Sequence, residues 1–308
     1  MELSGKMTAA PVQSQLPADG TNPEGELFDL GKFKANADEW AVRYASNKPF
    51  PHIVLDDMLR VGPEFADENF PGEQWPNWRS LGDSYQVKKF TCDDISKIPD
   101  PFARLIHELS APSFLRALEK VTGIPKLLPD PYLAGGGLHL SGPGGILAPH
   151  TDFHIYDAMD LYRRVNILVY LNEDWDESFG GCLEVGDVGT DRALVVPGWG
   201  KVMIFTTDDK SVHGFPKPIA EGHWRRSVAL YYYTSLEAPG FSGDASTHWR
   251  DHGVQHGAGR KLRFGLFKVF MQTSRAFSLL AHLTNPNQGM GWWKHRQDRL
   301  AKDAAEGR

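Results

Sequence analysis

The amino-acid sequence predicts a mainly β fold, an antiparallel sandwich or small barrel, with helices flanking it. From Tyr132 to Thr234, short runs rich in β-branched and aromatic residues alternate with clusters of Gly, Pro, Asn and Asp. Runs of this length with turn residues between them are typical of antiparallel strands. The chain shows no alternation of strands with helices and no GxGxxG motif that opens a helix, which argues against a dinucleotide-binding fold.

Five runs supply the predicted strands, and the residues before them predict helices. The strand runs are RVNILVYL, GCLEV, RALVVP, KVMIFTT and RRSVALYYYT. Apolar residues at helical spacing predict a helix over residues 38–46 and two helices between Pro99 and Gly123. We expect Ser113 to be the N-cap of the second of these and Gly123 to end it. A further short strand is expected at Ile53–Leu55.

Changes in composition divide the chain into four predicted parts. Residues 1–26 are rich in Gly, Pro, Ser, Gln and Asn without periodicity, which predicts a flexible leader. Residues 27–131 are expected to form a supporting region of helices and strands. Residues 132–235 form the predicted β core, and residues 236–308 form a basic, partly helical C-terminal extension.

The overall composition is that of a soluble globular chain. Of 308 residues, 41% are hydrophobic and 23% are charged, which excludes a disordered protein and a collagen-like fibre. No apolar run approaches the roughly 20 residues of a membrane span, and the first residues lack the pattern of a secretory signal. Two cysteines, Cys92 and Cys182, are too few for a disulfide framework, so a reducing cytoplasm is the expected setting.

Charge is distributed unevenly. Residues 250–308 contain 11 Lys/Arg and 4 Asp/Glu, whereas the remaining chain contains 22 basic and 35 acidic residues. An acidic body argues against nucleic acid as a partner, because phosphate binding requires a basic face. The basic extension either packs against the acidic body or meets an anionic substrate or a membrane surface.

Three residues carry the pattern of a metal site. In the run APHTDFH, His150 and Asp152 are two positions apart, so both side chains project to one side of a strand. His213, in KSVHGF, follows 61 residues after Asp152 and is the candidate third ligand. Two histidines and one carboxylate on one face form the facial triad of non-haem iron(II) oxygenases, which leaves positions open for co-substrate and O2.

A second candidate binding motif lies at the start of the run RRSVALYYYT. Strand alternation places Arg225 and Ser227 on one face and points Arg226 the other way. A guanidinium with a hydroxyl two residues later can bind a carboxylate by charge-assisted hydrogen bonds, which suits the distal carboxylate of 2-oxoglutarate. The alternative is that both arginines are solvated charges ahead of an edge strand.

These motifs, in this order, resemble the iron(II)/2-oxoglutarate-dependent dioxygenases, and within them the prolyl-4-hydroxylase-like group. The resemblance rests on RRVNILVYLNEDWDESFGGCLEV, on VVPGWGKVMIF followed by TTDDKSVHGF, and on the final RxSxALYYYT strand. It is nearer still to bacterial members of uncertain substrate that combine GGGLH with HxDF. It covers roughly 100 of the 308 residues and implies a double-stranded β-helix, the jelly-roll or cupin-like core.

The resemblance also implies roles for individual residues. His150, Asp152 and His213 match the iron ligands, and Arg225 matches the basic residue that binds the C5 carboxylate of 2-oxoglutarate. Tyr170 matches a tyrosine that assists at that carboxylate, and Ser227 is the same-face neighbour of Arg225. The implied cofactor is Fe(II), with 2-oxoglutarate and O2 as co-substrates and ascorbate considered as a stimulant.

We therefore expect hydroxylation of an unactivated C–H bond with release of succinate and CO2. The substrate is expected to be a small molecule or a peptide: a peptidyl or free amino acid, a sugar or a secondary metabolite. Two alternatives stay open, a catalytically silent cupin-like binding module and a zinc-dependent hydrolase or isomerase on a related barrel.

Two further histidine features are open to more than one interpretation. His139 could face the cavity or be structural. The run HTDFH has two histidines at the spacing of a zinc-protease helix, but it lacks the glutamate of that motif. The sequence leaves the oligomeric state open.

Overall fold

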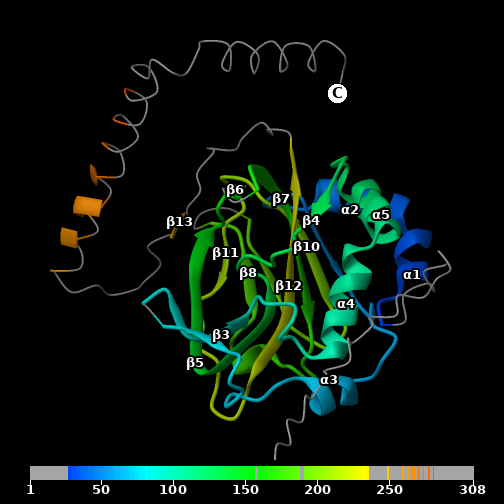
Figure 1. Cartoon of the computed structure of the whole chain (residues 1–308), viewed down its shortest axis with the longest axis horizontal. Helices are drawn as coiled ribbons and strands as arrows, with labels where there is room; N and C mark the ends of the chain where they lie inside the picture. The colour runs from blue at the N-terminus through cyan, green and yellow to red at the C-terminus, as the bar shows by residue number, and fades with distance from the viewer. Residues whose placement is uncertain are drawn as a thin grey trace, which may run out of the picture. The chain divides into compact units, whose positions relative to one another are not determined.

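A computed structural model places a large antiparallel sheet at the centre of the protein (Figure 1). It describes residues 27–235 except 83, 157–158 and 188–190, together with residues 248–249 and scattered positions between 259 and 280. The chain divides into two units, Met1–His252 and Gly253–Arg308. The described positions of the second unit are helical.

The strands of the first unit follow one path, β1-β10-β7-β12-β5-β11-β8-β9, with the others paired along its sides. The runs that the sequence predicted as strands supply β7 to β10 and β12. The bounds are β1 His52–Leu55, β2 Arg79–Leu81, β3 Gln86–Cys92, β4 Leu128–Pro129, β5 Gly137–Thr151, β6 Ile155–Tyr156, β7 Leu161–Tyr170, β8 Leu183–Val185, β9 Ala193–Val195, β10 Val202–Thr206, β11 His213–Phe215, β12 Arg225–Thr234 and β13 His248–Trp249.

Strand β5 closes the fold because its two halves pair with different strands. Its first half pairs with β12, where Gly137–Ser141 lie opposite Arg225–Ala229. Its second half pairs with β11 through Leu147 and His150, and β11 continues into β8 and β9. The sheet therefore curls into a nearly closed barrel, the double-stranded β-helix that the sequence predicted.

Helices cover the outer face of the sheet formed by β10, β7 and β12 (Figure 1). They are α1 Leu30–Ala35, α2 Ala37–Ser46, α3 Glu64–Asn69, α4 Asp100–Ser110 and α5 Pro112–Thr122, with one 3-10 turn at Glu177–Phe179. The predicted helices correspond to α2, α4 and α5. Ser113 is not the N-cap of α5, because Pro112 takes the first helical position and Ala111 precedes it as the cap. Gly123 ends α5 in the left-handed conformation, as predicted.

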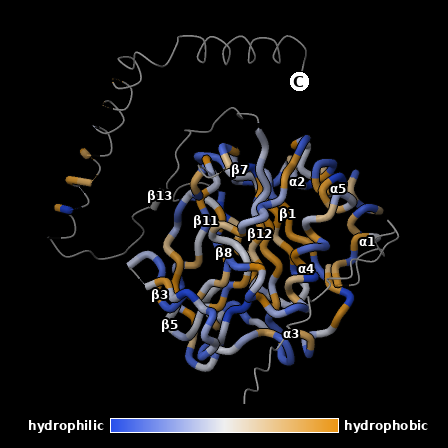
Figure 2. Tube along the Cα trace, viewed as in Figure 1, coloured by the Kyte–Doolittle hydropathy of each residue, from blue (hydrophilic) through white to orange (hydrophobic). Residues whose placement is uncertain are grey.

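Alternation along the central strands separates a hydrophobic layer from a polar one. On β7, Val165, Ile167 and Val169 point to the helices and join the main core. Figure 2 shows hydrophobic residues recurring along the strands and helices on this side. The intervening Asn166, Leu168 and Tyr170 face the inside of the barrel, so the polar side chains there are enclosed by the fold.

The region before residue 132 takes part in the same sheet. Strand β1 pairs with β10, and β3 pairs with the first half of β5. The predicted leader 1–26 lies outside the described residues, as does most of the predicted extension 236–308. The division into those four parts stays a prediction. In the described part of the chain, no helix is both long enough and apolar enough to span a bilayer. The cytoplasmic setting stays a prediction as well.

The close approach of β3 to β5 makes Gly137 a sensitive position. Gly137 and Gly222 have the same φ of 81°, but only at Gly137 would a Cβ overlap a neighbour, the carbonyl group of Cys92. We expect Gly137→Ala to lower the free energy of unfolding by ~1–3 kcal/mol more than Gly222→Ala, because both share the backbone strain and only one is overpacked. Denaturant unfolding of the two variants measures the difference, and equal losses would contradict the packing described here.

Candidate functional site

A cavity of about 310 Å³ lies inside the barrel and contains most of the residues that the sequence singled out. Its walls come from β2 and β3 on one side and from β5, β7, β8, β10, β11 and β12 around the remainder. The predicted site residues among its lining are His150, Asp152, His213, Arg225 and Ser227. His139 also lines the cavity, so its side chain faces inward, which is one of the two alternatives that the sequence left open.

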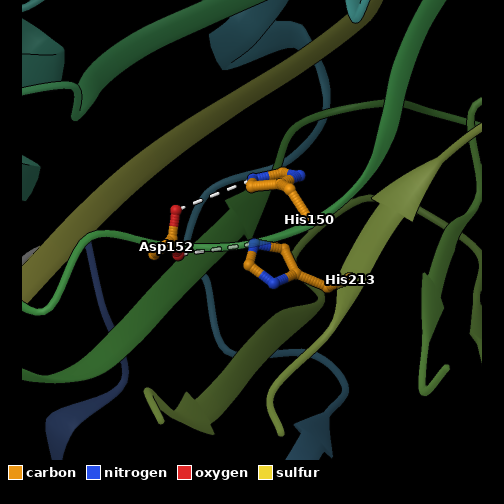
Figure 3. Close-up of side chains that lie close together, drawn as sticks. All are labelled: His150, Asp152 and His213. Atoms are coloured by element: carbon orange, nitrogen blue, oxygen red, sulfur yellow. Dashed lines mark ion pairs between the residues drawn. The ribbon is translucent and has the colours of Figure 1, made fainter. Parts of the chain in front are cut away.

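Strand register brings the two predicted histidine ligands together. His150 on β5 lies directly opposite His213 on β11, although they are far apart in sequence. Their ring centroids are 4.5 Å apart. Asp152 follows just after the end of β5 and turns back toward both rings (Figure 3). All three residues are buried.

The three side chains form a cluster that one ion could share. Nε2 of His150 is 3.6 Å from Oδ1 of Asp152, and Nε2 of His213 is 3.5 Å from Oδ2 of the same carboxylate (Figure 3). One ligand atom from each residue lies within 4.8 Å of the other two. Two ligand atoms at right angles on an ion with bonds of about 2.1 Å are ~3 Å apart, so these separations fit a metal centre.

Hydrogen bonds at the far side of each ring prepare the histidines as ligands. Nδ1 of His150 donates to the carbonyl oxygen of Ala148, and Nδ1 of His213 donates to that of Ser211, each at 2.9 Å. This tautomer leaves the Nε2 lone pair of each ring directed at the cluster. Burial lowers the pKa of His213 to about 4, so its imidazole is neutral at neutral pH and available to a metal.

Asp152 is held in place by two residues that sequence reasoning did not identify as part of the site. Nδ2 of Asn166 donates to Oδ2 of Asp152 at 2.7 Å, and the Arg163 guanidinium lies 3.0 Å from the same oxygen. Nε of Arg163 also donates to Oδ1 of Asn166. Burial alone would raise the pKa of Asp152, but the Arg163 charge and the nearby imidazoles outweigh it and hold the pKa well below its usual range. Asp152 is therefore ionised.

An irregularity in the pairing of β7 with β12 explains why Arg163 faces the cavity, which simple strand alternation would not predict. Tyr232 pairs with Val165, but the next residue, Tyr233, pairs with Arg163, so the register shifts by one residue on β7. The shift turns Arg163 to the cavity side even though its odd number matches the outward residues. Once inside, its guanidinium stacks 3.4 Å from the ring centroid of Tyr231.

Across the cavity, Arg225 is a buried cation that no carboxylate in the described part of the chain neutralises. Its Nε donates to the carbonyl oxygen of Gly181 at 2.8 Å, and its Nη1 is 3.5 Å from the Ser227 hydroxyl. Burial lowers the pKa of Arg225, which expresses the cost of placing a charge there without a counter-ion. The site therefore favours an anion from outside the chain.

Ser227 lines this end of the cavity, whereas Tyr170 is not part of the lining and lies beside Arg225. They are opposite each other on β7 and β12, and the Arg225 guanidinium lies 5.0 Å from the Tyr170 ring centroid. The Tyr170 hydroxyl is buried without a well-formed hydrogen bond, and burial raises its pKa to about 12, so it stays protonated and can donate. Arg226 points outward as predicted and pairs with Asp67 at 2.6 Å.

The remaining histidines of the predicted region are not part of the metal cluster. His139 accepts or donates a hydrogen bond at Nε2 with the carbonyl oxygen of Gly135, 3.1 Å away, and burial keeps its pKa well below the usual value. His154 lies 3.6 Å from Asp209. The segment that contains it is not helical, which agrees with the absence of a zinc-protease motif.

Comparison with known proteins identifies relatives of the core. Residues 136–233 match the 2OG-Fe(II) oxygenase superfamily. Prolyl 3-hydroxylase OGFOD1 of Mus musculus is 22% identical over 200 residues, which are 62% of this chain and 34% of that protein. The chain thus spans about a third of the length of this curated relative.

The solved structures that match are less similar in sequence. A prolyl hydroxylase from Trichoplax adhaerens, solved with a peptide of hypoxia inducible factor, is 15% identical and has a TM-score of 0.46, with 66% of this chain and 91% of that chain covered. The α-ketoglutarate-dependent epimerase SnoN from nogalamycin biosynthesis is 17% identical and has a TM-score of 0.48, with 73% and 97% covered.

The contacts of Asp152 predict how metal affinity depends on Asn166. We expect the purified protein to bind one Mn(II) ion, and Asn166→Ala to weaken that binding by roughly 10- to 100-fold, because the carboxylate loses the hydrogen bond that orients it. Titration followed by electron paramagnetic resonance measures the affinity. Asn172→Ala is the matched control, since Asn172 is a buried asparagine that bonds only to backbone groups away from the cluster. Equal losses in both variants would contradict this role of Asn166.

Proposed function

The chain belongs to the 2OG-Fe(II) oxygenase superfamily, and from that premise we propose that it hydroxylates an unactivated C–H bond of an organic substrate. Iron(II) is its metal and 2-oxoglutarate its co-substrate. When bound, they supply the oxidising power that inserts one atom of O2 into the substrate and the other into succinate, while 2-oxoglutarate loses CO2. The C–H bond becomes C–OH, so atoms and electrons balance.

One observation carries the proposal: a buried two-histidine, one-carboxylate cluster shares its cavity with a buried guanidinium that lacks a carboxylate. The cluster fits a ferrous ion with open positions. The guanidinium fits the far carboxylate of a dicarboxylic acid whose other end reaches the metal. A zinc-dependent hydrolase or isomerase would need only the metal cluster, and a catalytically silent cupin-like binding module would need neither feature. The chemistry of 2-oxoglutarate needs both.

We assign the roles as follows. His150, Asp152 and His213 hold the metal, with the His213 imidazole neutral and the Asp152 carboxylate ionised. Arg225 binds the C5 carboxylate of 2-oxoglutarate, and the Tyr170 hydroxyl, which is buried beside the guanidinium and stays protonated, donates to the same carboxylate. Ser227, two residues further along β12, accepts a hydrogen bond from the Arg225 guanidinium and presents its hydroxyl to the same end of the cavity.

Asp152 also bears on the type of product. A carboxylate at this position occupies a metal site that halogenating relatives leave to chloride, so its presence favours hydroxylation. The substrate class includes a peptidyl or free amino acid, a sugar and a secondary metabolite, because residues outside the core decide what is bound. Stimulation by ascorbate stays a prediction.

The proposed reaction predicts succinate formation that depends on both iron and 2-oxoglutarate. We expect the purified protein with Fe(II), 2-oxoglutarate and O2 to release succinate, and His213→Ala to reduce the rate to background, because a metal with only two protein ligands is lost from the site. Succinate is quantified by mass spectrometry. Full activity of the variant would remove His213 from the ligand set, and turnover without O2 would favour the zinc-enzyme alternative.

The two adjacent arginines provide a test of the co-substrate site. We expect Arg225→Ala to raise the KM for 2-oxoglutarate by ~30-fold or more, since loss of a buried charge partner costs about 2–5 kcal/mol. Arg226→Ala removes only an exposed pair with Asp67 and leaves the KM unchanged. Initial rates of succinate release at varied 2-oxoglutarate measure both. The reverse outcome, with Arg226 essential and Arg225 dispensable, would contradict the assignment.

A further inference from the structure

The cavity contains more positive charge than the proposed reaction uses. Its lining includes four basic side chains, Arg79, Lys89, Arg163 and Arg225, and a single acidic one, Asp152. Arg163 is paired with Asp152, and Arg79 is paired with Asp93 at 3.1 Å. If Arg225 binds 2-oxoglutarate, Lys89 is the cation of the cavity that has no assigned partner.

A β-bulge directs Lys89 into the cavity. Between β3 and β5 the register shifts at Lys88, which adopts a left-handed conformation with a φ of 47°. Without the shift, alternation along β3 would place Gln86 and Lys89 on opposite faces. With it, Gln86, Lys89 and Thr91 all line the cavity, while Lys88 is exposed to solvent. Bulges of this kind recur beside active sites, where they re-aim a side chain.

The Lys89 ammonium has little to neutralise it. Its hydrogen bond is to the side-chain oxygen of Gln86, at 3.3 Å, and no carboxylate in the described residues forms an ion pair with it. Burial lowers the pKa of Lys89 to about 8, and the charges of Arg225, Arg163 and Arg79 act in the same direction against the field of Asp152. The ammonium is therefore charged at neutral pH, in surroundings that disfavour the charge until an anion arrives.

Its position separates Lys89 from the proposed co-substrate carboxylate. Lys89 on β3 and Arg225 on β12 both pair with Ser141 of β5, so β5 lies between them. With strands ~4.8 Å apart, their backbones are separated by about 10 Å, and β7 with Tyr170 lies one strand further away. Arg225, Tyr170 and Ser227 thus form one anion site on the far side of β5, and Lys89 faces the cavity from the hairpin of β2 and β3.

We propose that the Lys89 ammonium binds an anionic group of the substrate, a carboxylate or a phosphate, and so selects an anionic organic molecule over its neutral analogues. The inference rests on the proposed function, because it assigns 2-oxoglutarate to Arg225. The substrate anion docks against β3, at the cavity wall formed by β2 and β3, and the C–H bond to be hydroxylated lies between that anion and the metal ligands.

The first experiment measures anion binding without turnover. The protein is loaded with Zn(II), which does not react with O2, and with 2-oxoglutarate to fill the Arg225 site. Inorganic phosphate and acetate are then titrated calorimetrically into wild type, Lys89→Met and Lys88→Met. Lys88 is the matched control because it is the adjacent lysine and points to solvent. Circular dichroism checks that each variant is folded.

We expect wild type and Lys88→Met to bind one of the two anions equally well, and Lys89→Met to bind it at least tenfold more weakly. The anion that binds shows whether the group is a phosphate or a carboxylate. The proposal is overturned if Lys89→Met binds the anion as wild type does, or if wild type binds neither. Because no catalysis is involved, this result stands apart from success or failure of the succinate assay.

The second experiment identifies the substrate class by turnover. Succinate release is screened with pairs of compounds, each an anionic molecule and its neutral ester or amide. We expect only the anionic members to stimulate release, and Lys89→Met to raise the KM of the best one at least tenfold while kcat changes less. Stimulation by the neutral members to the same extent would overturn the proposal. So would an increase in the KM for 2-oxoglutarate alone, which would assign Lys89 to the co-substrate.

Discussion

The site depends on one cross-strand pair, His150 of β5 opposite His213 of β11. Strand pairing alone brings these rings within reach of each other, and the chain that leaves β5 then returns the Asp152 carboxylate to both. The two Nε2 atoms and the carboxylate are buried here facing one another, and such an arrangement suits a bound cation. The fold therefore builds the site by backbone hydrogen bonding, and the cluster that results fits a metal ion.

Other parts of the barrel hold the metal cluster in place. Strand β5 lies between β12 and β11 in the sheet, so any shift in its register would separate the metal cluster from the Arg225 end of the cavity. The helices cover the opposite face of β7 and β12, and their packing fixes the strands from behind. Asn166 and Arg163 then hold Asp152 from β7, so the orientation of the carboxylate is coupled to the same hydrophobic layer.

Much of the fold and of the candidate site could be predicted from the sequence, because the alternation of side chains along a strand and the order of motifs can be read from the chain itself. The inward positions of Arg225 and Ser227 and the outward position of Arg226 follow from parity in a regular strand. Arg163 and Lys89 could not be placed in the same way, because each lies beside a register shift that reverses the expected face. Ser113 failed as an N-cap because Pro112 fits the first helical position better. Irregular pairing, which depends on the partner strand, is what the sequence alone does not reveal.

Residues outside the part of the chain that matches the family also line the cavity. Strands β2 and β3 lie before residue 136, where the family match begins, yet they form one cavity wall. The matched core contains the metal cluster, and our proposal for Lys89 assigns contacts with the substrate to the hairpin of β2 and β3. This division agrees with the general observation that recognition is carried by elements around a shared fold.

The most direct measurement is the optical absorption of the anaerobic protein with Fe(II) and 2-oxoglutarate. We expect a visible metal-to-ligand charge-transfer band in wild type, because the keto acid chelates an iron held by His150, Asp152 and His213. The same band should need a much higher 2-oxoglutarate concentration in Arg225→Ala. A folded wild-type protein that binds Fe(II) but develops no such band at saturating 2-oxoglutarate would contradict the central claim.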